Sequence, residues 1–116
     1  MKPGERDTAH LWDMLDAARR AQRLTSGMDY ETFIGDERTN LAVERLLENI
    51  GEAASHVSDA GRATLPAIPW RGIVGMRNVL AHRYGTVDQR LVWDSATTGV
   101  AQLVDALASV AGMQDV

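Results

Sequence analysis

Arginine, histidine and tyrosine stand close together in RNVLAHRY, at Arg77, His82 and Tyr84. Cleavage of RNA by the neighbouring 2′-hydroxyl requires a base for its proton, a cation for charge on the phosphorane oxygens, and an acid for the leaving 5′-oxygen. A histidine can be the base or the acid, and an arginine can bind the phosphate. This chemistry requires no metal or cofactor.

The spacing limits how these groups can meet. Arg77 and His82 are five residues apart, so they lie about 140° from one another on an ideal helix. Because one histidine cannot be base and acid at once, a two-fold homodimer with two copies of each residue would meet the requirement more fully. Asn78 shares a helix face with His82 and could fix its tautomer. The alternative is structural: a helix-dipole partner, a half-buried histidine and a packing tyrosine.

Composition bounds the class of protein. With 116 residues, 45% of them hydrophobic and 24% charged, the chain is expected to form one domain over residues 1–116. We expect a cytoplasmic protein without a membrane span, because there is no cysteine and no apolar run of the required length. A net charge of −4 argues against a broadly basic nucleic-acid-binding surface. From Arg71 to Arg90, however, four arginines and one aspartate give +3, so Arg71 and Arg83 are candidate phosphate contacts.

Apolar periodicity and stop signals predict an all-α protein, an antiparallel bundle of four to five helices. The first expected helix starts at Asp7 or Thr8 and ends at Gly27, and a short helical turn follows over 29–35. A long helix is expected from Asp36 to about Ala60, another from Pro69 or Trp70 towards His82, and a last one from Asp88 onward. In the last helix the positions Val92, Ala96, Gly99, Leu103, Ala106 and Val110 follow a seven-residue rhythm. Such a narrow seam suits pairing of helices.

Other polar residues give weaker signals. Glu44, Glu48 and Glu52 form an i, i+4, i+8 row, with His56 four residues after Glu52. Carboxylate metal sites in bundles require a partnering helix with further Glu or His, and none is found, so a solvated acidic face is the interpretation. His10 and His56 are expected to have surface or packing roles, and the three tryptophans to anchor the core.

The motif also carries a resemblance. RNVLAHRY resembles the R-x4-H-x-Y motif of HepT-like toxins in the HEPN superfamily, and the likeness extends through AVERLLENIGEAASHVSDAGR and LPAIPWRGIVGMRNVLAHRYGTVDQRLVWD, from Ala42 to Asp94. The resemblance implies a homodimeric, HEPN-like helical ribonuclease that works without metal and inhibits growth by cutting RNA. Arg77 and His82 match the catalytic pair, Asn78 the polar residue after the arginine, and Tyr84 the motif tyrosine.

The resemblance also implies a partner, an MntA-like nucleotidyltransferase antitoxin of a type VII toxin–antitoxin system. That antitoxin blocks the toxin by transferring AMP onto the tyrosine that corresponds to Tyr84. Two alternatives are open: a catalytically silent subunit that binds nucleotide or substrate for a nucleotidyltransferase, and a plain helical adaptor. Arg83 stands at the variable position before Tyr84, where relatives often have an acidic residue.

Overall fold

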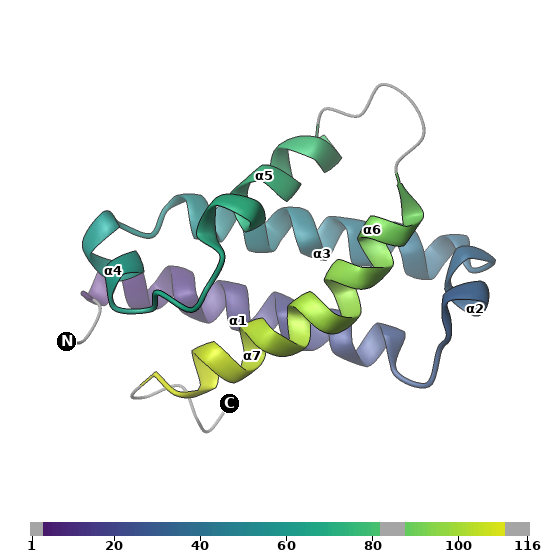
Figure 1. Ribbon diagram of the computed structural model, residues 1–116, viewed down its shortest axis with the longest axis horizontal. Helices are drawn as coiled ribbons and strands as arrows, with labels where there is room; N and C mark the ends of the chain where they lie inside the picture. The colour runs from purple at the N-terminus through teal and green to yellow at the C-terminus, as the bar shows by residue number, and fades with distance from the viewer. Residues whose placement is uncertain (1–3, 82–87, 111–116) are drawn as a thin grey trace.

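All regular structure in the described part of the chain is helical, as predicted (Figure 1). The computed structural model describes residues 4–81 and 88–110. Its helices are α1 (Glu5–Thr25), α2 (Tyr30–Ile34), α3 (Glu37–Ser55), α4 (Asp59–Ala63), α5 (Trp70–Ala81), α6 (Gln89–Asp94) and α7 (Val100–Ala108), with one π-helical turn, η1 (Ser95–Gly99), between α6 and α7. The short helical turn expected over 29–35 is α2, and α6, η1 and α7 together form the one helix expected from Asp88 onward. The short helix α4 was not predicted.

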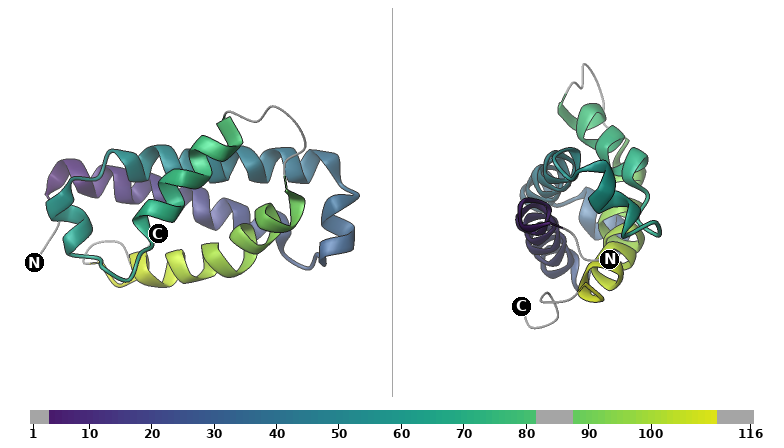
Figure 2. Two further views of the ribbon diagram at one scale, coloured as in Figure 1. Left: turned by 45° about the horizontal axis from the view of Figure 1, so that its top comes forward. Right: turned by 90° about the vertical axis from the view of Figure 1, so that its left-hand side faces the viewer.

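The long helices form two layers. α1 and α3 lie side by side and antiparallel, while α5 and the α6–α7 rod lie across them (Figures 1 and 2). The described residues share one apolar core, whose largest fully buried side chains are Leu11, Met14, Leu15, Phe33, Val43, Leu80, Val92 and Leu107. In the two described ranges, no helix combines the length and apolar character that crossing a bilayer demands.

Three aspartates begin helices where the sequence predicted them. The carboxylates of Asp29 and Asp36 each accept a hydrogen bond from the backbone N–H three residues later, at 2.8 and 3.0 Å. Asp88 accepts from the N–H groups two and three residues later, at 3.0 and 3.2 Å. These contacts satisfy N–H groups that have no partner within the helix, so each cap fixes where its helix starts. Gly27, with φ of 78°, follows the end of α1 as expected.

The predicted start of α1 is wrong. Neither Asp7 nor Thr8 is the N-cap, because α1 begins one turn earlier with Gly4 in that position. The Asp7 carboxylate instead accepts hydrogen bonds from the hydroxyl and the backbone N–H of Ser58, at 2.6 and 2.9 Å. These bonds, the hydroxyl first, lower the pKa of Asp7 below its ordinary value. The first turn of α1 is thereby attached to the segment that follows α3.

The same contact explains why α3 ends at Ser55 rather than near Ala60. Ser58 accepts a hydrogen bond from the N–H of Gly61 at 3.0 Å and so begins the separate helix α4. Gly61 was predicted to end the long helix, but it lies inside α4. A glycine is required there because a Cβ would collide with the carboxylate of Asp7. The chain therefore turns between α3 and α4 to bring Ser58 to α1.

A π-helical turn changes the apolar register of the last rod. The buried positions are Val92, Ala96, Val100, Leu103, Leu107 and Val110. The seven-residue rhythm therefore holds at four of its six predicted positions. At the other two, Val100 is buried instead of Gly99, and Leu107 instead of Ala106. A π turn contains one extra residue, and this moves the following side chains around the helix axis.

Candidate active site

Gly51 lets α3 and α5 approach closely beside Arg77. A Cβ at Gly51 would lie 2.5 Å from the Cβ of Arg77 and 2.9 Å from the carbonyl oxygen of Ile73. Ordinary carbon contacts are about 3.5–4.0 Å, so a larger residue would force the two helices apart. An isolated glycine within a helical pattern is the sequence signal for such an approach. The close contact places the polar residues that follow Gly51 next to the arginine.

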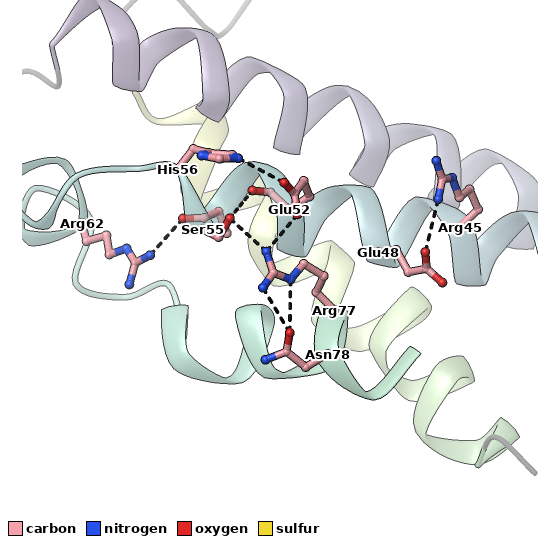
Figure 3. Close-up of polar contacts among 9 residues, drawn as sticks. Arg45, Glu48, Glu52, Ser55, His56, Arg62, Arg77 and Asn78 are labelled. Atoms are coloured by element: carbon pink, nitrogen blue, oxygen red, sulfur yellow. Dashed lines mark hydrogen bonds and ion pairs between the residues drawn. The ribbon is translucent and has the colours of Figure 1, made fainter. Parts of the chain in front are cut away.

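The guanidinium of Arg77 is fixed from two sides (Figure 3). From α3, the Oε2 of Glu52 and the hydroxyl oxygen of Ser55 accept from Nη1 at 2.8 and 3.2 Å. From α5, the Oδ1 of Asn78 accepts from Nε at 3.3 Å and from Nη2 at 3.1 Å. With 30% of its side chain exposed, Arg77 is a held cation that solvent can still reach. Sequence reasoning found the arginine but missed both of its partners on α3.

Asn78 has a contact that the sequence did not predict. It was expected to orient His82, but its oxygen binds the guanidinium of Arg77. Three of the predicted site residues, His82, Arg83 and Tyr84, lie outside the described residues. The proposed contact between Asn78 and His82 therefore stays a prediction. Arg71 is exposed near the start of α5, and its phosphate-binding role also stays a prediction.

The glutamate row on α3 is not the solvated acidic face that was predicted. Glu44 is only 4% exposed. Glu52 lies between two basic side chains, with Oε1 at 3.1 Å from the Nε2 of His56 and Oε2 at 2.8 Å from Arg77. Hydrogen bonds from His56 and then Arg77 lower the pKa of Glu52. At neutral pH this carboxylate is therefore charged and holds the arginine.

The two histidines predicted to have surface or packing roles lie against one another. The rings of His10 on α1 and His56 at the end of α3 stack, with centroids 5.2 Å apart and planes inclined by 28°. This pair, Glu52 and Arg77 form a continuous row of ionisable groups from α1 through α3 to α5.

An arginine held in this way can stabilise negative charge. Because Glu52 and Ser55 engage Nη1, the Nε and Nη2 groups point along the edge that Asn78 now occupies. A phosphate that bound this edge in bidentate fashion would take the place of the Asn78 oxygen. The described part of the site thus supplies the cation, and the predicted base or acid is His82.

The sequence is similar to those of known proteins. A sequence profile described as "Ribonuclease HepT-like" matches residues 14–110. The chain is 34% identical over 103 residues to "Probable ribonuclease HepT" of Thermococcus cleftensis, covering 89% of this chain and 92% of that protein. It is 39% identical over 85 residues to "Putative RNase MJ1380" of Methanocaldococcus jannaschii, covering 73% and 78% of the two chains. No solved structure gives a significant match.

Proposed function

Because the chain belongs to the HepT-like ribonuclease family, we propose that it is a metal-independent endoribonuclease and the toxin of a type VII toxin–antitoxin pair. The observation that carries this proposal is Arg77, which stands at the head of the R-x4-H-x-Y motif and is oriented by Glu52 and Ser55. An oriented guanidinium is the electrostatic element that phosphoryl chemistry requires.

In the proposed reaction, the 2′-oxygen of a ribose attacks the adjacent phosphorus and the bond from phosphorus to the 5′-oxygen breaks. His82 exchanges the protons, taking one from the 2′-hydroxyl or giving one to the leaving 5′-oxygen. Arg77 binds the phosphate oxygens as negative charge builds on them. The products are a 2′,3′-cyclic phosphate and a free 5′-hydroxyl.

The proposal includes a homodimer with two copies of Arg77 and His82 around one phosphodiester. One histidine has one proton to exchange, whereas the reaction requires a base and an acid. A second protomer supplies the missing group without another residue type. A mixed dimer of wild-type and His82→Ala protomers is therefore expected to cleave far less than half as fast as the wild-type dimer.

We also propose that an MntA-like nucleotidyltransferase is the antitoxin and that Tyr84 is its target. Transfer of AMP from a nucleoside triphosphate to the tyrosine oxygen, with loss of pyrophosphate, would add a phosphodiester two residues from His82. The added anion would compete with RNA for Arg77. Mass spectrometry after incubation with the antitoxin and ATP would locate the modification, and Tyr84→Phe should block it.

The main test is cleavage of single-stranded RNA in excess chelator, with analysis of the product ends. We expect cyclic phosphate ends from the wild type and a loss of activity in both Arg77→Ala and His82→Ala, with dimers that remain folded. Glu48→Gln is the control, because Glu48 lies one turn before Glu52 and pairs with Arg45 rather than Arg77. Undiminished cleavage by His82→Ala would refute the mechanism.

One observation favours a second function, a silent subunit that binds nucleotide without cutting RNA. The Nε and Nη2 groups of Arg77 are engaged by Asn78, so binding of phosphate must first displace a neighbouring side chain. A silent subunit would bind AMP or ATP, gain thermal stability from it and leave growth unaffected when expressed alone. Slowed growth that depends on His82 would exclude this function.

A further inference from the structure

A polar groove lies between α1 and α3, on the side of Glu52 that faces away from Arg77. It has a volume of about 380 Å³, and its lining includes His10, Asp13, Asp16, Arg20, Glu52 and His56. The two histidines stack at its edge. Of these residues, the mechanism proposed above uses only Glu52. One of its carboxylate oxygens contacts His56 at the groove, and the other contacts Arg77.

We propose that His56 is a positioning residue that acts through Glu52 on Arg77 and makes phosphate binding depend on the charge of His56. This inference rests on the proposed function, because it concerns the RNA phosphate that Arg77 would bind. His56 itself is not placed against the RNA.

The first part of the argument is geometric. The side chain of Glu52 is 58% exposed, so packing alone does not fix its position. Two hydrogen bonds fix it instead, one from His56 to Oε1 and one from Arg77 to Oε2 (Figure 3). Contact with His10 in turn limits rotation of the His56 ring. Without His56, the carboxylate can rotate about its side-chain bonds and orient Arg77 less well.

The second part concerns charge. Histidine is the residue type that changes its charge between pH 5 and 8. A protonated His56 shares the negative charge of Glu52 with Arg77, so the guanidinium is less neutralised and attracts a phosphate more strongly. When His56 is neutral, the negative charge of Glu52 acts mainly on Arg77 and neutralises the guanidinium more fully. RNA affinity should therefore be higher when His56 is protonated than when it is neutral.

Other charged groups lie near His56. From α1, Asp13, Asp16, Arg20 and His10 line the same groove. From α4, Arg62 donates hydrogen bonds to the carbonyl oxygens of Val57 and Ala54. Among the described residues His56 pairs with Glu52, which also pairs with Arg77, so Glu52 transmits the change to Arg77.

The binding experiment compares RNA dissociation constants at pH 6 and pH 8 in a His82→Ala background, which removes cleavage and the titration of His82. Exposed ion pairs change affinity by about two- to fivefold, and this is the gain expected on going to pH 6. His56→Gln retains a hydrogen-bond donor without a charge, so it should keep the affinity at pH 8 and lose most of the gain. His56→Ala should also bind more weakly at pH 8.

A second measurement does not depend on RNA. The side-chain N–H resonance of Arg77 should shift with pH in the wild type, in step with the ring of His56, and this shift should disappear in His56→Gln. Glu48→Gln, which changes a charge elsewhere on α3, should leave both measurements unchanged. A full pH-dependent gain in RNA affinity in the His56→Gln variant, together with an undiminished pH-dependent shift of the Arg77 resonance, would overturn the inference. If RNA does not bind at any pH, the proposed function fails, and the Arg77 resonance alone decides whether His56 positions that side chain.

Discussion

Substitution of Gly51 by alanine tests whether the close approach of α3 and α5 sets the position of Arg77. The new methyl carbon would lie 2.5 Å from the Cβ of Arg77 and 2.9 Å from the backbone oxygen of Ile73. Carbon atoms in contact are about 3.5–4.0 Å apart, so the helices must separate by roughly 1 Å. Because the first of these contacts is to the Cβ of Arg77 itself, the separation moves the guanidinium away from Glu52.

Two effects of opposite sign determine the stability of Gly51→Ala. Overpacking at a helix contact costs about 1–3 kcal/mol, whereas replacing glycine by alanine within a helix stabilises by about 1 kcal/mol. The net loss is about 1 kcal/mol, which corresponds to a melting temperature roughly 4 °C lower. Catalysis should suffer more, since a displacement of about 1 Å can reduce a rate by about 100-fold. We therefore expect a folded variant with little ribonuclease activity.

The assay measures thermal unfolding by circular dichroism and cleavage of a fluorescent RNA with the same preparations. Gly72→Ala is the matched control on α5, because a Cβ there meets nothing within 4 Å. It should be as active as the wild type and slightly more stable. If Gly51→Ala cleaves RNA at the wild-type rate and melts at the wild-type temperature, the reasoning about the helix contact is wrong.

Three further predictions concern single polar contacts. Asp7→Asn should lower the free energy of unfolding by about 2 kcal/mol at pH 7, because Ser58 donates two hydrogen bonds to the carboxylate. Folding lowers the pKa of Asp7, so this stabilisation is lost as the pH falls through the folded-state pKa. Urea unfolding below that pKa should therefore give the same free energy of unfolding for wild type and variant. Glu52→Gln keeps an oxygen that can accept from Arg77 but removes the negative charge that partly neutralises the guanidinium, so KM for RNA should fall, and an unchanged KM in steady-state kinetics would contradict the effect of Glu52 on Arg77. Arg77→Lys should retain the charge but lose the forked geometry, so cleavage should fall about tenfold or more, and wild-type rates would show that a point charge suffices.

Local signals in the sequence predicted much of the helical arrangement. The caps Asp29, Asp36 and Asp88 could be predicted because each accepts a hydrogen bond from an N–H only two or three residues later. A contact of this range depends on the local sequence alone. The all-α class followed from the apolar period. Where α3 ends could not be predicted in this way, because it depends on Asp7, which is 51 residues from Ser58.

The last rod shows the same limit. Its seven-residue rhythm identified Val92, Ala96, Leu103 and Val110 as buried, but one π turn moved burial to Val100 and Leu107. A period assumes uniform helical geometry, and a single extra residue in one turn rotates the buried face, so that Leu103 and Val110 stay buried while Val100 and Leu107 replace Gly99 and Ala106. Packing against the other helices selects the register in which larger side chains are buried.

The sequence by itself determined the types and order of the reactive groups, with Arg77, His82 and Tyr84 in one motif, and the caps that bound the helices. Only the tertiary structure decided which groups act on the arginine. Glu52 is 25 residues from Arg77, and it reaches the guanidinium because Gly51 leaves room for α3 and α5 to touch. Hydrogen bonds within one helical turn follow from spacing, whereas contacts between helices exist only after the apolar faces have packed.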